Sequence, residues 1–564
     1  MATTIEATLG PAPLVGRRRT AAFAVVALAF VMDLLDGTIV NIAIPSIRAD
    51  LGASYADVQW LSAGYALAFA VLLITGGRLG DIAGYKRLFL IGVAGFTVAS
   101  LLSGLAWAIP VLVVARLLQG MTAALMAPQV ISLMQVMYPP EERAGVGGIF
   151  GALGGLAATL GPILGGLLIQ WNIAGLDWRP IFLINVPVGI FAFVAGVRML
   201  PNARSPHPLR LDLVGTVLIV LALGLLVFPL IQGRELDWPA WVFVMMATSV
   251  PVFALFWWLQ LQESRRGGSP LVLPELFRTR TFLLGLVINS TFQMALLGFL
   301  FTLTLLLQIG LGYSVLAAAV TGIPTAIGIS ISIAALAPKL VPVIGRYTLT
   351  VGVVTMAVGI GLVLWPLRAF GLGTNGWVLA PGLLLVGLGM GLVMGLMFVV
   401  TLKDVDATHA GSASGTLSAA NQLGGAVGIT LVGLVLFGTL SAGAGPAFDQ
   451  HSAPVRSAVV AAGAPEARAD AAVQAVRSCY VARVSAKDPS AQPAECAAVQ
   501  AASGPGSGAI GSTVATASKR ATADDFEQAY AWTMALSGVL LAICLVLGLL
   551  LPRRIEFAPA AVSA

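Results

Sequence analysis

Apolar segments of about 20 residues, the length a helix needs to cross a bilayer, recur along this chain and constrain its fold more than any other feature. Of the 564 residues, 58% are hydrophobic and only 10% are charged. A soluble domain carries about 25% charged residues. The sequence therefore predicts an all-α, polytopic membrane protein with fourteen spans. They cover residues 21–42, 58–77, 88–106, 110–137, 145–169, 181–199, 211–231, 239–260, 282–307, 315–338, 347–367, 377–401, 411–438 and 528–551.

The Lys and Arg residues predict how the spans are oriented. Nineteen of them fall in one alternating set of connections and termini, and four fall in the short loops of the other set. Because cytoplasmic loops carry the excess of Lys and Arg, the larger set is predicted to face the cytoplasm. Both termini then lie inside, which requires an even number of spans. We expect a multi-pass protein of the bacterial inner (plasma) membrane, and a monomer.

Several classes of function are disfavoured by composition. Three cysteines argue against a disulfide framework or a Cys-rich metal site, and the three histidines lie outside the apolar segments. No G-x-x-x-x-G-K-[S/T] phosphate loop and no cluster of catalytic side chains is found. The net charge of +6 comes from short loops between spans rather than from a nucleic-acid-binding surface. We expect no enzyme activity, no cofactor, no metal and no nucleic-acid partner.

The loop between the second and third predicted spans carries a dense motif. Residues 77–87 read G-R-L-G-D-I-A-G-Y-K-R, which resembles the G-x-L-x-D-x-x-G-x-K-R loop of the major facilitator superfamily. Glycine permits a tight turn with positive φ, and an aspartate can cap the next helix and pair with a cation. The basic pair holds the loop on the cytoplasmic side. The residues that carry the resemblance are Gly77, Asp81, Gly84, Lys86 and Arg87.

Ionisable residues inside two predicted spans are the strongest functional signal. Residues 35–45 (L-D-G-T-I-V-N-I-A-I-P) resemble the first-helix motif of the 14-helix drug:proton antiporter family, and Asp33 lies one turn before Asp36. The fourth span carries an R-x-x-Q-G motif that begins at Arg116. Asp36 and Arg116 each lie about six residues, or about 9 Å, from the outer end of their helix. We expect them to approach each other, as a proton-coupling pair or as a static ion pair.

The fifth predicted span contains Gly161-Pro162-Ile163-Leu164-Gly165-Gly166. This run resembles the antiporter motif of exporters in the same superfamily, although Ala157 replaces a glycine of the pattern. A proline and closely spaced glycines permit a kink and close helix contact. The other reading is generic glycine-rich packing. Residues 178–189 and 411–428 resemble two further family stretches, so that the resemblance covers most of residues 20–438.

The resemblance implies two six-helix bundles with two extra central helices. The predicted parts are a cytoplasmic N-terminus (1–20), a first bundle (21–200), the extra pair (211–261), a second bundle (282–551) and a cytoplasmic tail (552–564). The second bundle includes a long extracytoplasmic insert, 440–525, whose stretch 453–483 has the composition of a surface helix. Cys479 and Cys496 lie in this insert, as a disulfide or as two free thiols.

These features together predict a proton-coupled antiporter that exports lipophilic, neutral or monocationic drugs or antibiotics across the bacterial inner membrane. Its partners are the lipophilic substrate, protons and the bilayer; the alternative is a dedicated exporter of one endogenous product. Asp33, Asp36 and Arg116 are the only charges expected inside the spans, so we expect dications to be exported poorly. Polar residues that either line the substrate cavity or pack helices together are Tyr65, Asn289, Gln293, Gln308, Asn421 and Gln422.

Overall fold

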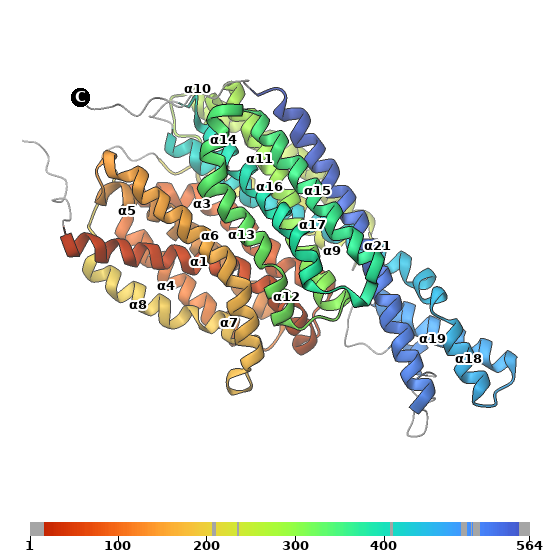
Figure 1. Cartoon of the computed structure of the whole chain (residues 1–564). Helices are drawn as coiled ribbons and strands as arrows, with labels where there is room; N and C mark the ends of the chain where they lie inside the picture. Colours follow the sequence, from red (N-terminus) through yellow and green to blue (C-terminus); the bar gives the residue numbers. More distant parts are fainter. Residues whose placement is uncertain are drawn as a thin grey trace, which may run out of the picture.

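The computed structural model describes residues 16–205, 210–233, 236–405, 410–486, 493–497, 499 and 508–551, and every regular element among them is a helix (Figure 1). Residues 1–15 of the predicted N-terminal segment and the whole predicted tail, 552–564, lie outside the described residues. So does part of the predicted insert, including 487–492 and 500–507.

Six membrane-length helical segments make up the first half. Several are composite: a π-helical turn interrupts the second, and the sixth is divided between two helices. Helices α6 and α7 each begin with a proline, whose missing N–H costs nothing in the first helical turn. The elements are α1 (Gly16–Leu51), α2 (Tyr55–Gln59), η1 (Trp60–Gly64), α3 (Tyr65–Ala83), α4 (Tyr85–Gly104), α5 (Ile109–Met137), α6 (Pro140–Trp171), η2 (Ile173–Gly175), α7 (Pro180–Leu183) and α8 (Asn185–Met199).

Two helices follow, α9 (Leu213–Gln232) and α10 (Ala240–Arg265), which pack against each other. A short 3₁₀ segment, η3 (Pro274–Arg278), leads from them into the second half. The remaining elements are α11 (Arg280–Leu305), η4 (Leu306–Gly310), α12 (Val315–Thr321), α13 (Ile323–Ile331), η5 (Ser332–Leu336), α14 (Ala337–Ile344), α15 (Tyr347–Phe370), η6 (Gly371–Gly373), α16 (Gly376–Leu402), α17 (Ala410–Gln450), α18 (Ala453–Ala461), α19 (Glu466–Ser485), η8 (Ala494–Cys496) and α21 (Gly508–Gly548).

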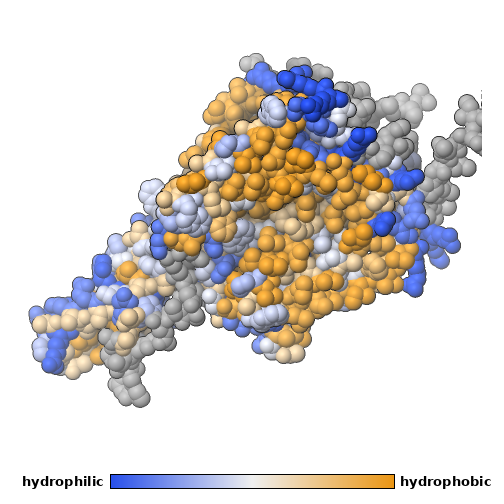
Figure 2. Space-filling model, turned by 180° about the vertical axis from the view of Figure 1, so that it is seen from behind, coloured by the Kyte–Doolittle hydropathy of each residue, from blue (hydrophilic) through white to orange (hydrophobic). Residues whose placement is uncertain are grey.

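The number of spans agrees with the sequence analysis. In the described part of the chain, thirteen helical segments are long and apolar enough to cross a membrane. The 32-residue helix α6, with Pro162 inside it, is the fourteenth. Figure 2 shows apolar residues covering the side of the bundle, with hydrophilic residues gathered towards its ends. This distribution is what a bilayer requires, because lipid cannot solvate polar groups.

Helices within each half pack closely, and a few glycines set the distances that matter for the site. In the first half α1 lies against α6 and α8, while α5 lies against α3 and α4. A Cβ on Gly120 of α5 would overlap the carbonyl oxygen of Tyr65 on α3. Glycine therefore lets these two backbones approach, as small residues do at helix interfaces in membranes. The boundaries proposed for the two bundles and the extra pair stay predictions.

The described residues of the insert 440–525 form a helical extension at one end of the bundle (Figure 1). Helix α17 continues to Gln450 and α21 begins at Gly508, while α18 and α19 pack beside these two stalks. The extension has its own apolar core and a disulfide between Cys479 and Cys496. That core consists of Ala444, Ala447, Phe448, Val476, Tyr480 and Ala521.

One expectation for the extension is wrong. The composition of 453–483 predicted one surface helix, whereas the structure has α18 and α19 separated by residues 462–465. Gly463 has a φ of 88° and Pro465 is the N-cap of α19. A positive φ ends a helix and a proline cannot continue one. The break folds α19 back, so that Arg456 of α18 bonds Asp470 of α19 (Nε to Oδ1, 2.6 Å).

Candidate functional site

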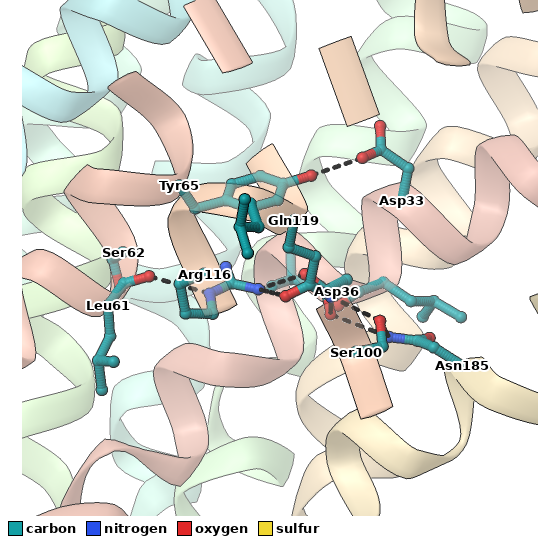
Figure 3. A network of polar contacts seen from close by, with 12 residues as sticks. Asp33, Asp36, Leu61, Ser62, Tyr65, Ser100, Arg116, Gln119 and Asn185 are labelled. Carbon is teal, nitrogen blue, oxygen red and sulfur yellow. Dashed lines mark hydrogen bonds and ion pairs between the residues drawn. The ribbon is translucent and has the colours of Figure 1, made fainter. Parts of the chain in front are cut away.

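The buried centre of the first half is an ion pair between α1 and α5. The Nη1 atom of Arg116 lies 2.5 Å from Oδ2 of Asp36, and each residue is only 1% exposed (Figure 3). The Nε atom of Arg116 also donates to the Leu61 carbonyl at 3.1 Å, where the π-helical turn η1 presents it. The two charges predicted to approach each other therefore share one hydrogen-bonded site.

Three further polar residues complete the site around Asp36 (Figure 3). Its Oδ1 atom accepts hydrogen bonds from Gln119 Nε2 at 2.7 Å and Asn185 Nδ2 at 2.9 Å. Gln119 also donates to Ser100 Oγ at 2.8 Å and accepts from Arg116 at 2.7 Å. The sequence analysis did not select these residues. Gln119 lies in the R-x-x-Q-G motif and Asn185 in residues 178–189, so the motifs held a signal for two of the three.

Asp33 lies in a different environment from Asp36. Its Oδ1 atom accepts one hydrogen bond, from the Tyr65 hydroxyl at 2.5 Å. The Tyr65 ring meanwhile lies against Arg116, with the guanidinium carbon 4.3 Å from the ring centre. Tyr65 was predicted as a cavity residue, and the structure places it between the two carboxylate sites (Figure 3).

Protonation would have different consequences at the two carboxylates. Protonating Asp36 would leave the buried Arg116 charge without its anion, and an unpaired buried charge is strongly destabilising. Protonating Asp33 would disturb only its bond with the neutral Tyr65 hydroxyl. The arrangement thus sets a buried ion pair beside a carboxylate whose hydrogen bond is to a neutral hydroxyl. Among the described residues, no group of His, Cys, Asp and Glu side chains could hold a metal ion.

Helix α6, which carries the antiporter-like motif, lies between α1 and the second half. A Cβ on Gly161 would overlap Thr38 Oγ1, and one on Gly165 would lie 2.8 Å from Ile39 Cγ1. The neighbouring Gly166 faces the other way, since a Cβ there would lie 3.1 Å from the Leu316 Cα of α12. Pro162 lies inside the helix between these contacts. The motif therefore lets α6 approach both halves, although a role in antiport remains a prediction.

A small cavity of about 80 Å³ opens beside the Asp36 side chain. Its walls come from α1, α6, α7 and α8 and are apolar except for Asp36 and Asn185. Ile184, which lines the cavity between α7 and α8, is 37% exposed. The cavity shows that the carboxylate is not packed tightly on every side.

The other predicted cavity residues do not join this site. Gln308 Nε2 donates to the Ile42 carbonyl at 3.1 Å and so connects η4 of the second half to α1. Asn289 is buried on α11, and Gln293 Oε1 on the same helix has no hydrogen-bond partner among the described residues. Asn421 Oδ1 on the neighbouring α17 is likewise unpartnered in the described part of the chain, and Gln422 is half-buried. Their contact with substrate stays a prediction.

The loop motif at residues 77–87 forms a tight connection between α3 and α4. Gly84 has a φ of 97°, the conformation expected of it. Asp81 does not cap α4; it lies within α3 and accepts from the Tyr85 hydroxyl at 3.0 Å. Lys86 Nζ donates to the Val197 carbonyl of α8 at 2.8 Å, and Arg87 is exposed. A Cβ on Gly77 would lie 3.6 Å from Pro128 of α5.

The expectation that only Asp33, Asp36 and Arg116 are charged inside the spans is wrong. Arg78 is 5% exposed at the end of α3. Asp525 is 2% exposed in α21, three residues before the predicted start of that span. The second half therefore does contain a buried acid, which was missed because α21 begins about twenty residues before the apolar window. Asp525 lies against Gly443 at the root of the extension rather than beside the Asp36 site.

Fourteen membrane-length helices, with a buried, hydrogen-bonded ion pair inside the first half, define a multi-pass membrane protein. The family model described as "Major Facilitator Superfamily" matches residues 26–429, and the chain belongs to this superfamily. The resemblance found in the motifs is thereby confirmed.

The comparisons with known proteins agree. The chain is 40% identical to the "Probable actinorhodin transporter" of Streptomyces coelicolor, over 97% of this chain and 93% of that one. It is 36% identical to the "Tetracenomycin C resistance and export protein" of Streptomyces glaucescens, over 73% and 74%. A solved bacterial homolog of the human lysosomal transporter Spinster superposes with a TM-score of 0.58 and 16% identity, over 97% of this chain and 100% of that one. This last similarity shows the fold alone.

Proposed function

We propose that this protein is a proton-coupled antiporter that exports lipophilic, neutral or monocationic drugs or antibiotics across a bacterial inner membrane. The observation that carries the proposal is the pair of carboxylates on α1, of which Asp36 is paired with Arg116 and Asp33 is held only by Tyr65. Drug and antibiotic export is supported by the relatives named for actinorhodin and tetracenomycin C. The antiporter-like packing of α6 on α1 supports the same direction of transport.

In the proposed cycle, protons and substrate compete for the α1 carboxylates. Substrate binding from the cytoplasm favours release of a proton from Asp33, and protonation from the outer side favours release of the substrate. Asp36, Arg116, Gln119 and Asn185 keep α1 aligned with α5 and α8 while Asp33 exchanges. One proton that moves inward across 100 mV supplies about 2.3 kcal/mol, and a tenfold concentration gradient of a neutral compound requires about 1.4 kcal/mol.

The test is proton movement in proteoliposomes that contain the purified full chain and carry an imposed pH gradient. Ethidium is added to the wild type, Asp33→Asn and Asp36→Asn. We expect ethidium to trigger proton release in the wild type, and both variants to lose it. Ethidium export that continues without any proton movement would contradict coupling, and no transport across a broad panel of lipophilic compounds would contradict the drug-export proposal.

A dedicated exporter of one endogenous product is the second candidate. The observation in its favour is that similarity to the actinorhodin transporter runs over 545 residues and so reaches the extension as well as the spans. Similarity to the tetracenomycin C protein covers only 422 residues. Export of a single compound from a panel of structurally unrelated ones would favour this reading over broad drug export.

Both candidate functions predict the same orientation of the protein in the membrane. The bundle end with Lys86 and Arg87 would face the cytoplasm, together with both termini, and the extension would lie outside. Labelling of single cysteines introduced at exposed Arg204 and exposed Ala462 in intact cells tests this. Only the cysteine at Ala462 is expected to react with a membrane-impermeant reagent.

A further inference from the structure

Arg78, which the proposed function does not use, lies at a junction between three parts of the protein. It is at the Lys86 end of α3, in the first half, and is 5% exposed. Its guanidinium reaches the segment that leads from α10 towards the second half. Nη1 donates to the carbonyl of Ser269 at 2.8 Å, and Nη2 donates to those of Pro270 and Leu271. Nη1 also donates to the carbonyl of Arg210, just before α9, at 3.0 Å.

The same segment is held from its other side by the extra helices. Asp212, the N-cap of α9, accepts from the Leu271 N–H at 3.1 Å and from Gln260 Nε2 of α10 at 2.6 Å. Gln260 Oε1 in turn accepts from the Val272 N–H at 3.0 Å. Arg78 thus binds the carbonyls of the segment while Asp212 and Gln260 bind its amides. We call residues 269–272 with these three side chains the α3–α9–α10 junction.

A second polar contact joins α3 to α9 one turn away. The hydroxyls of Thr75 and Thr216 lie 3.0 Å apart, and both residues are buried. Arg78 and Thr75 are three residues apart and therefore lie on one face of α3. Inside a membrane the lipid tails are as apolar as the side chains, so the hydrophobic effect does not drive helices together. Hydrogen bonds such as this one therefore help to hold them together.

Contacts of the extra pair with the second half are of another kind. Val227 and Ile231 of α9 join the apolar core that continues into the second half. Beyond residue 272, η3 packs Phe277 between Trp257 of α10 and Phe282 of α11. Apolar contacts such as these can slide, whereas a clamp of buried hydrogen bonds cannot be broken without leaving polar groups unsatisfied.

We propose that Arg78 is a positioning residue that fastens the α9–α10 pair to the first half, so that the pair moves with α3 during transport. The second half then pivots on the chain beyond the junction, at η3. The second half proper begins at α11, where Thr281 Oγ1 donates to Asp404 Oδ2 at 2.8 Å. The inference goes beyond the proposed function, since it holds for any transported substrate and does not require proton coupling.

A covalent link beside Arg78 tests the proposal in the full chain. Thr75→Cys and Thr216→Cys are combined in a Cys544→Ala background, which retains the Cys479–Cys496 disulfide, and the new pair is oxidised. A pair that moves with α3 tolerates this link, so ethidium export is expected to stay within about twofold of the reduced protein. Export that is lost on oxidation and restored by reductant would overturn the proposal.

Arg78→Gln supplies the second test. Hydrogen exchange of the amides of Ser269, Leu271 and Val272 and of the first turn of α9 is expected to rise at least about tenfold, because the carbonyls of this segment lose their donor and the segment loosens. Export is expected to fall, and the oxidised Thr75→Cys/Thr216→Cys pair is expected to restore both. Arg204→Gln removes the same charge from an exposed residue at the same end and is the matched control. Unchanged exchange in Arg78→Gln, or a loss that the cross-link does not repair, would overturn the proposal.

The exchange measurement is independent of transport. A protein that exports no ethidium still reports whether the junction opens, so failure of the proposed function and failure of this inference are distinguishable. If Arg78→Gln does not fold, the cross-link in the presence of Arg78 still decides whether the pair moves relative to α3.

Discussion

Tyr65 lays its ring against Arg116, with 4.3 Å between the ring centre and the guanidinium carbon. The hydroxyl of the same side chain donates to Asp33, while Arg116 pairs with Asp36. One aromatic residue on α3 therefore touches both carboxylate sites of α1. A change at either acid can therefore affect the other through Tyr65 and Arg116. This link is the physical basis for the first two predictions.

Asp36→Asn is expected to destabilise the protein, whereas Asp33→Asn is not. The first variant leaves Arg116 buried without an anion, which costs about 3–5 kcal/mol, whereas the second keeps an amide oxygen that can still accept from the Tyr65 hydroxyl. Thermal unfolding in nanodiscs measures the difference. The double variant Asp36→Asn/Arg116→Gln is expected to be more stable than Asp36→Asn alone, though inactive. Equal stability of the single and double variants would show that a buried Arg116 without its anion does not destabilise the protein.

Tyr65→Phe and Tyr65→Leu separate the two contacts of the tyrosine. The phenylalanine keeps the ring on Arg116 and loses only the donor to Asp33, and a hydrogen bond to a charged group contributes about 1.5–3 kcal/mol. We expect substrate-triggered proton release to fall about tenfold in Tyr65→Phe, and thermal stability to fall by no more than this hydrogen bond contributes. Tyr65→Leu is expected to be less stable than Tyr65→Phe, because it also removes the cation–π contact.

Gly161→Ala tests the packing of α6 on α1. The added Cβ would overlap Thr38 Oγ1, and overpacking of this kind costs about 1–3 kcal/mol. Lower thermal stability and slower export are expected. Thr38→Ala, which removes the overlapping oxygen, is expected to restore both when combined with Gly161→Ala. Failure of this rescue would show that glycine serves another purpose at position 161.

Removal of the disulfide is expected to loosen the extension without stopping transport. Cys479 and Cys496 are 17 residues apart in sequence, and closing a loop of that size stabilises a fold by about 3 kcal/mol. Cys479→Ser should make the extension sensitive to limited proteolysis, while the spans stay intact. Ethidium export from the same preparation provides the control, and its complete loss would show that the extension takes part in transport.

Asp177→Asn is expected to stabilise the loop between α6 and α7 in a pH-dependent way. Desolvation, together with the neighbouring Asp50 carboxylate, raises the pKa of the Asp177 carboxyl above its ordinary value of 3.8, although Arg179 opposes this. A raised pKa in the folded state means that the wild type loses stability as pH rises through that pKa. The variant should therefore unfold at a higher temperature than the wild type at pH 7, and at the same temperature below pH 3.8. The gain is less than about 1 kcal/mol, because Asp177 is only half-buried and solvent screens its charge.

The spans and the superfamily could be predicted because the information is local. Each span is a contiguous apolar run, and each motif lies within about a dozen neighbouring residues. Depth along a helix also follows from residue number, since each residue rises about 1.5 Å, so the approach of Asp36 to Arg116 was predictable. Asp525 was missed for the same reason: it lies outside the apolar window, on a helix that continues beyond it.

The sequence by itself determined the apolar helices and their number, since a bilayer accepts only helices with internally bonded backbones, and it indicated the buried charges of Asp36 and Arg116. Tertiary structure alone decided which side chains meet. Gln119 and Asn185 reach Asp36 from two different helices, Ser100 of a third helix accepts from Gln119, and Arg78 reaches carbonyls nearly two hundred residues away. Such contacts depend on the rotation of each helix about its axis and on close approaches like that of Gly120 to Tyr65. Packing sets both, and no local pattern in the chain encodes them.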